Sequence, residues 1–442
     1  MERGFNGEFP RLFIGCKRGL IITLLLFLCV VFVSSSFAGD EVTPAIDKAD
    51  TAWMLVSTAL VMLMTPGLAI FYAGMARKKN VLGTIMHSFF VLALISVQWV
   101  LWGYTLSFGG DVGGVIGALE YLGLNGVGGE PKGTIPHLVF MMFQGMFAII
   151  TVALITGGFA ERIRFSAVVV FSILWATLVY DPLCHWIWGG GWLSQLGTLD
   201  FAGGMVVHIS CGVSAIVAAI VIGKRRGYPR ELMPPHNLTL TVIGMGLLWF
   251  GWFGFNAGSA LAANDIAAFA FVNTNTAAAM ATLTWVFIEW IHRGKPTVLG
   301  AVSGAVAGLA SITPAAGFVG PGSALLVGLV GGGLCYWAVG ILKPRLGYDD
   351  TLDVFGIHAV GGTWGSIATG LFASIGAKGL FFGNPYQLVA QFIGIISAVL
   401  LSVVGTFIIL KLVDVVIKIR VSNEEEIEGL DLSQHGESGY VL

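Results

Sequence analysis

Charged side chains are scarce in this sequence. Asp, Glu, Lys and Arg together make up 11% of the 442 residues, whereas 56% are hydrophobic, and the mean hydropathy is +0.85. A soluble globule of this size needs more polar side chains to cover its surface. The composition therefore excludes a soluble globular protein and indicates one that lies in a membrane.

Cysteine is scarce too, with five residues in the chain. Two of them fall in the N-terminal leader described below, and Cys184, Cys211 and Cys335 stand singly without C-x-x-C spacing. This spacing indicates neither a zinc site nor a disulfide framework, and we expect no metal or cofactor. The net charge of −2 and the lack of a basic stripe argue against nucleic acid as a partner.

Residues 1–38 are typical of a secretory leader. Basic residues precede the apolar run 20–33, and the segment 34–38, in which all residues but Phe37 are small, follows it. The run is short for a membrane span. We expect a signal peptide that is cleaved after Ala38, with an uncleaved twelfth helix as the alternative.

Eleven further apolar stretches have about the length of a membrane-spanning helix. About 20 helical residues cross a hydrocarbon core about 30 Å thick. Lys and Arg gather in every second loop between the stretches, which places the mature N-terminus outside and the C-terminus inside. The stretches lie near residues 51–75, 84–108, 135–157, 166–189, 201–222, 238–262, 267–291, 298–313, 321–341, 354–374 and 387–417.

An odd helix count suggests two five-helix halves of opposite orientation, followed by one last helix. We expect the halves at about 51–225 and 238–375 and the last helix at about 387–417. The predicted fold is an all-α integral membrane protein of eleven transmembrane helices, with two inverted five-helix repeats plus a final helix, N-out and C-in. The transmembrane domain would cover 39–420, and 421–442 would form a cytoplasmic regulatory tail.

A repeated spacing of Asp and His supports the duplication. Asp200 precedes His208 by eight residues at the head of the fifth stretch, and Asp350 precedes His358 by eight at the head of the tenth. Eight helical residues rise about 12 Å, so two histidines that enter from opposite faces reach similar depths near the midplane. An ionisable side chain at that depth needs a partner or a cavity. The duplicated spacing favours a functional pair over two histidines packed separately in the core.

Aromatic residues are concentrated in a few motifs. Phe143 and Phe147 stand four residues apart and share one helix face. Trp188 precedes three glycines at the outer end of the fourth stretch, where the face of its ring could bind a small cation. The alternative for any single aromatic residue is a place in the interfacial or lipid-facing belt.

Four long segments, in order, resemble the signature segments of ammonium transporters of the Amt/Mep/Rh family, bacterial Amt type. The likeness runs from about Asp47 to the C-terminal tail. The segments are AERIRFS at 160–166, DFAGGMVVH at 200–208, GWFGFNAGS at 251–259 and DVFGIH at 353–358.

The resemblance implies a transporter and not an enzyme. It implies that Phe143, Trp188 and Ser259 recruit ammonium at an outer site, and that Phe147 and Phe255 close the floor of this site as a gate. Ammonium and potassium are similar in size and charge, but only ammonium can lose a proton. Deprotonation near the gate would therefore open a path that is closed to potassium, and ammonia would pass inward with its proton transferred.

Below the gate, the resemblance implies an apolar pore. His208 and His358 would be its paired imidazoles, and Trp252 would line it. Asp200 and Asp350 would support the structure without touching the substrate. A hydrogen-bonded imidazole pair can also relay a proton, because one ring nitrogen donates while the other accepts.

The family also implies partners and a location. These are a homotrimer with one pore per subunit, a PII-type signal protein at the cytoplasmic tail, and multi-pass insertion in the lipid of the cell inner (plasma) membrane. The substrate would be ammonium or ammonia, with methylammonium as a further candidate. Cys211 departs from the small Gly or Ala that is usual in the family, and we expect it to change only local packing.

Three alternatives remain open from the sequence. One is a Rh-like channel for neutral gases, which Trp188 and Phe147 argue against. The second is an enzyme or electron carrier in which His208 and His358 ligate haem or a metal. The third is an ammonium sensor that acts through a partner, since only about 25 residues follow the last stretch.

Overall fold

The structure is a computed structural model and describes residues 45–440. The predicted signal peptide lies outside the described residues. Within them, nine helical stretches are long and apolar enough to cross a membrane. This confirms the prediction of an all-α, multi-pass membrane protein. The nine are Lys48–Met75, Lys78–Phe108, His137–Phe159, Phe165–Gln195, Gly204–Ile222, Leu238–Gly258, Asp265–Arg293, Pro321–Leu346 and Pro385–Ile417.

The two other predicted spans are helical as well. The stretch 298–313 contains α12 (Val298–Ile312), a shorter apolar helix. The stretch 354–374 contains η7 (Phe355–Ala359) followed directly by α15 (Val360–Phe372). The count of eleven spans and their orientation in the membrane stay predictions.

Several spans are composite, because a π-helical turn joins two α-helices. The elements of the first half are α2 (Lys48–Met75), η1 (Lys78–Asn80), α3 (Val81–Gln98), η2 (Trp99–Gly103), α4 (Tyr104–Phe108), η3 (Leu119–Leu124), α5 (His137–Phe159), α6 (Phe165–Trp175), η4 (Ala176–Tyr180), α7 (Asp181–Ile187), α8 (Trp192–Gln195), η5 (Gly204–Ile209) and α9 (Ser210–Ile222). Those of the second half and tail, besides α12, η7 and α15, are α10 (Leu238–Gly258), α11 (Asp265–Arg293), α13 (Pro321–Trp337), η6 (Ala338–Leu342), α14 (Lys343–Leu346), η8 (Leu380–Phe382), α16 (Pro385–Ile417), α17 (Asn423–Glu428) and α18 (Leu430–His435).

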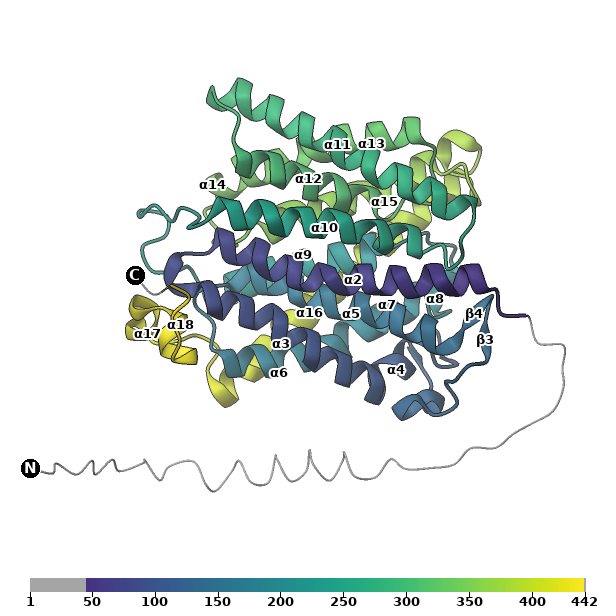
Figure 1. Cartoon of the computed structure of the whole chain (residues 1–442), viewed down its shortest axis with the longest axis horizontal. Coiled ribbons are helices and arrows are strands. Elements are labelled where there is room, and N and C mark those ends of the chain that lie inside the picture. The colour runs from purple at the N-terminus through teal and green to yellow at the C-terminus, as the bar shows by residue number, and fades with distance from the viewer. Residues whose placement is uncertain (1–44, 441–442) are drawn as a thin grey trace, which may run out of the picture. The chain divides into compact units, whose positions relative to one another are not determined.

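Two small antiparallel hairpins lie in the loop between α4 and α5. The first pairs β1 (Asp111–Val112) with β2 (Ile116–Gly117), and the second pairs β3 (Pro131–Lys132) with β4 (Ile135–Pro136). Figure 1 shows this loop at the end of the bundle opposite α17 and α18.

Short polar side chains start several of the helices. Asp47 accepts hydrogen bonds from the backbone N–H groups of Ala49 and Asp50 at the start of α2. Asn237 and Thr297 cap α10 and α12 in the same way. Such caps satisfy N–H groups that have no partner inside the helix, so each helix begins where the sequence supplies one.

The first helices of the two halves, α2 and α10, lie side by side (Figure 1). Gly74 near the end of α2 faces Thr241 near the start of α10, and Met64 in the middle of α2 faces Gly251. The two helices therefore run antiparallel. A Cβ at either glycine would lie within 2.4 Å of the partner helix, so only glycine permits this close approach.

The helices that carry the two histidines also cross in antiparallel fashion. A Cβ on Gly212 would lie 2.4 Å from the backbone nitrogen of Ala359, and one on Gly362 would lie 2.9 Å from the Cβ of His208. Gly362 thus lies against His208, and Gly212 lies against Ala359, the residue that follows His358. Oppositely oriented halves would give this exchange of contacts, and it explains why both glycines recur at the same spacing.

The C-terminal tail packs against loops at one end of the bundle, where α17 and α18 are drawn in yellow in Figure 1. Lys79 Nζ donates to the backbone oxygens of Glu426 and Ile427, at 2.7 and 2.6 Å. The Asp431 carboxylate accepts from the Gly83 N–H at 2.8 Å. The tail is therefore bound to the start of α3 through specific polar contacts, which a freely solvated end would lack.

Candidate functional site

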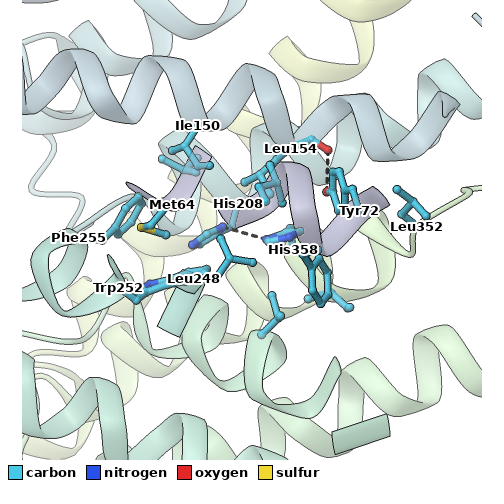
Figure 2. Close-up of a pocket in the computed structure, with 15 residues that line it drawn as sticks. Met64, Tyr72, Ile150, Leu154, His208, Leu248, Trp252, Phe255, Leu352 and His358 are labelled. Carbon is cyan, nitrogen blue, oxygen red and sulfur yellow. Dashed lines mark hydrogen bonds between the residues drawn. The ribbon is translucent and has the colours of Figure 1, made fainter. Parts of the chain in front are cut away.

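The two repeated histidines meet inside the bundle. The Nδ1 atoms of His208 and His358 lie 3.2 Å apart, and the ring planes are within 22° of parallel (Figure 2). Both side chains are buried, with 1% and 4% of their surface exposed. In such a contact one nitrogen donates a proton and the other accepts it. The structure thus brings together the pair that the sequence spacing predicted.

The two aspartates stand where each histidine helix begins, but they make different contacts. Asp200 Oδ1 accepts from the N–H groups of Gly203 and Gly204, and its Oδ2 accepts from two further backbone N–H groups. Asp350 Oδ2 accepts from the Phe355 N–H at 2.8 Å. Both carboxylates therefore hold a helix start, and Asp200 does so with four hydrogen bonds.

A narrow cavity runs along the histidine pair. Its volume is about 20 Å³, which is about enough for one small molecule. Trp252 stacks on His208 with ring centroids 5.4 Å apart, and its Nε1 donates to Thr313 Oγ1 at 2.9 Å. The walls are otherwise mostly apolar (Figure 2), and they include Met64, Leu68, Tyr72, Ile150, Leu154, Val207, Leu248, Val306, Leu352 and Ile357.

Two phenylalanines lie at the end of the cavity next to His208: Phe255 lines the cavity, and Phe147 packs on Phe255. The ring centroids of Phe147 and Phe255 are 4.3 Å apart, and each side chain is 1% exposed. The Phe255 ring also stacks near His208 at 6.1 Å. On its other side, Phe147 meets the Trp188 ring edge-on at 5.8 Å.

Beyond the phenylalanines lies a larger hollow of about 320 Å³. It is called the outer hollow because the predicted topology places this end of the bundle outside. Trp188 and Ser259, two residues predicted to recruit substrate, line it. Their hydrogen-bond donors are already used: Trp188 Nε1 donates to the Asp200 backbone oxygen, and Ser259 Oγ donates to that of Phe255, both at 2.8 Å. What remains is the face of the indole ring and the lone pairs of the hydroxyl oxygen, and both suit a cation that carries N–H donors. The other lining residues are Phe108, Phe140, Gln144, Phe147, Ile187, Asp200, Phe201, Leu261 and Phe318.

Phe143, the third predicted recruitment residue, is placed differently. Its side chain is fully buried, and it is absent from the lining of the outer hollow. The ring packs behind Phe147, with centroids 4.9 Å apart, and against the surface left open by Gly258. Gln144, one residue further along α5, lines the hollow instead, and the i, i+4 pattern of the aromatics gave no signal for it.

A second hollow of about 280 Å³ lies on the other side of the histidine pair. It is called the inner hollow because the predicted topology places this end of the bundle inside. Leu352 lines both this inner hollow and the histidine cavity, so the two are adjacent. Arg225, Lys343 and Asp353 also line it. The sequence gave no indication of it, because its charged residues come from loops that are distant in the chain.

Buried ion pairs stabilise the loops around the inner hollow. Arg225 binds both carboxylate oxygens of Asp349, at 2.8 to 3.2 Å, and contacts Glu161 at 3.3 Å. Burial opposes the charge of Asp349, but the hydrogen bonds from Arg225 prevail and lower the pKa of that carboxyl below its usual range. Burial lowers the pKa of the Arg162 guanidinium to about 10, so this group remains charged at neutral pH.

Together these features define an integral membrane transport protein: a bundle of membrane-spanning helices with a buried histidine pair between two hollows. The chain belongs to the Ammonium Transporter Family, whose model matches residues 52–440.

Relatives of known name support this membership. The ammonium transporter of Bacillus subtilis is 54% identical over 399 residues, which cover 88% of this chain and 98% of that protein. Ammonium transporter Amt1 of Archaeoglobus fulgidus is 52% identical over 396 residues, covering 89% and 99%. Among solved structures, Saccharomyces cerevisiae Mep2 matches with a TM-score of 0.81 and 39% identity over 86% of this chain and 88% of that one. A sensor Amt protein matches with a TM-score of 0.82 and 30% identity over 88% and 98%.

Proposed function

We propose that this chain transports ammonium across the cell inner membrane, by capturing the cation outside and passing ammonia along a buried histidine pair. One observation carries the proposal: the elements lie in a row. The outer hollow is followed by Phe147 and Phe255, and Phe255 lies next to His208. The cavity along His208 and His358 is then followed by the inner hollow.

Capture is proposed to occur in the outer hollow. The cation would lie over the Trp188 ring and donate a hydrogen bond to Ser259, whose own proton is held by the Phe255 backbone oxygen. Phe143 would act indirectly, by fixing the ring of Phe147 from behind. Asp200 lines the hollow, but four backbone N–H groups occupy its oxygens, so it would position the helix and not bind the cation.

Selectivity is proposed to come from deprotonation at the Phe147–Phe255 gate. Removing a proton from an amine cation whose pKa is about 9 to 10 costs roughly 3 to 4 kcal/mol at neutral pH. Carrying the intact charge into hydrocarbon costs at least a comparable amount. Neutral ammonia can then enter the narrow apolar cavity, whereas potassium has no proton to lose.

The histidine pair is proposed to guide ammonia and to relay the proton. A neutral imidazole offers one N–H donor and one acceptor, so the pair can hydrogen-bond ammonia from either side. The 3.2 Å contact between the rings also gives a direct route for a proton. Trp252 would support this arrangement by holding the His208 ring parallel to its own.

The remaining sequence predictions extend this proposal. They are a cleaved leader, eleven spans in two inverted repeats with the C-terminus inside, a homotrimer with one pore per subunit, and a PII-type signal protein at the tail. The antiparallel pairs of helices support the repeats, and the contacts of the tail with the loops support a regulated cytoplasmic face.

To test the proposal, the current and the internal pH change are measured in proteoliposomes that receive an ammonium pulse. Wild type is compared with the double variant His208→Ala, His358→Ala. His292→Ala serves as the matched control, because this exposed histidine bonds to Tyr336 and lies outside the proposed path. We expect a saturable ammonium current in wild type and control, and its loss, or a leak of potassium, in the double variant.

Two results would contradict the proposal. Internal alkalinisation of wild-type vesicles without current would show passage of neutral ammonia alone, as in a gas channel. Saturable binding of ammonium without any flux would identify a sensor.

A further inference from the structure

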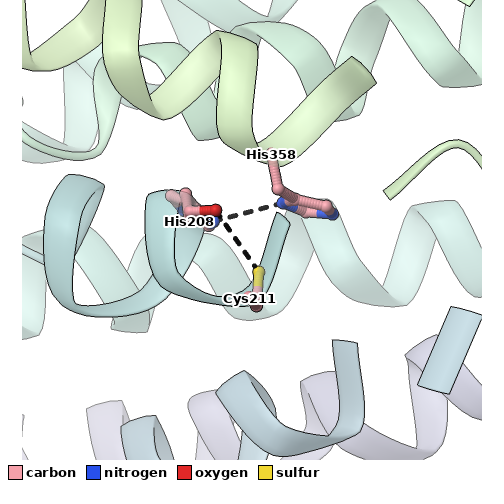
Figure 3. Close-up of side chains that lie close together, drawn as sticks. All are labelled: His208, Cys211 and His358. Atoms are coloured by element: carbon pink, nitrogen blue, oxygen red, sulfur yellow. Dashed lines mark hydrogen bonds between the residues drawn. The ribbon is translucent and has the colours of Figure 1, made fainter. Parts of the chain in front are cut away.

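A thiol lies beside the histidine pair. Cys211 is fully buried one turn after His208, and its sulfur and one nitrogen from each of His208 and His358 all lie within 4.8 Å of one another. Figure 3 shows the sulfur pointing toward the two imidazoles. The sequence predicted the histidine pair but not that the thiol would lie beside it, because the spacing of Cys211 does not fix its distance to His358 in the other half of the chain.

The Cys211 thiol is only weakly hydrogen-bonded. Its one hydrogen bond among the described residues goes to the His208 backbone oxygen, at 3.5 Å. His208 Nε2 has no hydrogen-bond partner in the same part of the chain, although the side chain is 1% exposed. The cluster therefore contains three metal-ligating groups and a spare site for an imidazole proton.

We infer that His208, Cys211 and His358 form a site for a soft monovalent cation, Cu(I) or Ag(I), and that occupation of this site blocks the pore. The site itself needs only the described geometry, whereas the block rests on the proposed function. Soft thiolate ligands select Cu(I), and imidazole nitrogens suit copper as well.

The distances fit a three-ligand site. With metal–nitrogen bonds of about 2.0 Å and a metal–sulfur bond of about 2.3 Å, two nitrogen ligands around one ion are about 3.3 to 3.5 Å apart, and nitrogen and sulfur about 3.7 Å. The Nδ1 atoms of the two histidines are already 3.2 Å apart. The sulfur, within 4.8 Å, would move by about 1 Å at most, which a small side-chain rotation supplies.

Charge selects the monovalent ion. On binding, the Sγ–H bond breaks, an Sγ–metal bond forms, and the thiol proton passes to bulk water. The imidazole that held its proton on Nδ1 moves it to Nε2, so both rings stay neutral. A monovalent cation with one thiolate and two neutral imidazoles gives a complex without net charge, whereas a divalent ion such as Zn²⁺ would leave one positive charge buried in the membrane.

Binding is tested first in detergent, without transport. Purified full-length protein is titrated anaerobically with Cu(I) in competition with bathocuproine disulfonate. Cys211→Ser keeps a hydroxyl in place of the thiol and should weaken binding by about 100-fold or more. Cys335→Ser is the matched control, since this buried thiol also contacts a backbone oxygen, that of Ile357 at 3.6 Å, but lies outside the cluster.

The block is tested in proteoliposomes with Ag⁺ in chloride-free buffer, each variant being scored against its own silver-free ammonium flux. We expect inhibition of wild type and Cys335→Ser, and an inhibitory concentration about 100-fold higher for Cys211→Ser. Equal Cu(I) affinity and equal Ag⁺ inhibition of wild type and Cys211→Ser would overturn the inference, as would a loss confined to Cys335→Ser. If wild type carried no ammonium at all, the proposed function would fail while the Cu(I) titration still decided the site.

Discussion

The substitution Asp200→Asn tests whether the carboxylate binds the substrate or holds the helix that carries His208. Oδ1 accepts from Gly203 and Gly204 at 2.9 and 2.6 Å, and Oδ2 accepts from Met205 and Val206 at 2.7 and 3.2 Å. An amide keeps one acceptor oxygen and turns an NH₂ group toward the other two N–H groups. Two buried donors then lose their partner, at about 1 to 3 kcal/mol each, so we expect a destabilisation of about 2 to 6 kcal/mol.

The same change should disturb transport. The four N–H groups belong to the start of the π-helical turn that ends one residue after His208, so its relaxation shifts the imidazole relative to His358. A displacement of about 1 Å at a reacting group can cost about 100-fold in rate. We expect the thermal midpoint in detergent to fall and the maximal ammonium current in proteoliposomes to fall by about 10- to 100-fold.

Asp350→Asn is the matched control for this argument. Asp350 makes one backbone hydrogen bond from its Oδ2, to the Phe355 N–H, and its Oδ1 has no partner among the described residues. An amide oxygen can take over that single bond, so at neutral pH we expect a thermal midpoint equal to or above that of wild type. Equal destabilisation by the two Asn variants would refute the reasoning. An Asp200→Asn protein of normal stability that had lost only its affinity for ammonium would show that the carboxylate acts on the cation.

Three further predictions concern single groups. Arg162 donates five hydrogen bonds to protein oxygens, and a lysine at this position can replace at most three of them. Arg162→Lys should therefore lose about 2 to 4 kcal/mol of stability, whereas Arg164→Lys at the half-exposed neighbour should lose under about 1. Thermal midpoints measure the difference, and equal midpoints would contradict this. Burial raises the pKa of Asp350 to about 6 from its ordinary value of 3.8, so the ionised carboxyl costs about 3 kcal/mol above pH 6. The stability advantage of Asp350→Asn should therefore be full at about pH 7.5 and vanish as the pH falls to about 4. An advantage independent of pH would argue against it. Trp252→Phe should lower the ammonium flux into vesicles more than Thr313→Val does. Both substitutions remove the hydrogen bond between these residues, but only the first alters the ring stacked on His208. The reverse order of the two fluxes would disprove the role of the ring.

Much of the architecture could be predicted because it depends on local chemistry. Hydrocarbon accepts only apolar helices, so runs such as 135–157 identified membrane-spanning helices directly, and α5 (His137–Phe159) lies where that run predicted. The pairing of His208 with His358 could also be predicted, because a spacing of eight residues fixes a depth and the duplication supplies the opposite direction. The helix count remains a prediction, since Val298–Ile312 and Phe355–Phe372 are helical but are not among the nine stretches long and apolar enough to cross a membrane.

The sequence by itself determined the class of protein and the helical segments, and it predicted the residues that are proposed to carry the chemistry, since each of these depends on composition and short spacings. The tertiary structure alone decided which side chains face the hollows. Phe143 and Gln144 are neighbours in the chain, yet the first is enclosed and the second lines the outer hollow, because helix rotation is set by packing. It likewise decided that the Cys211 sulfur lies beside the histidine pair, since the distance between Cys211 and His358 depends on how the two halves pack.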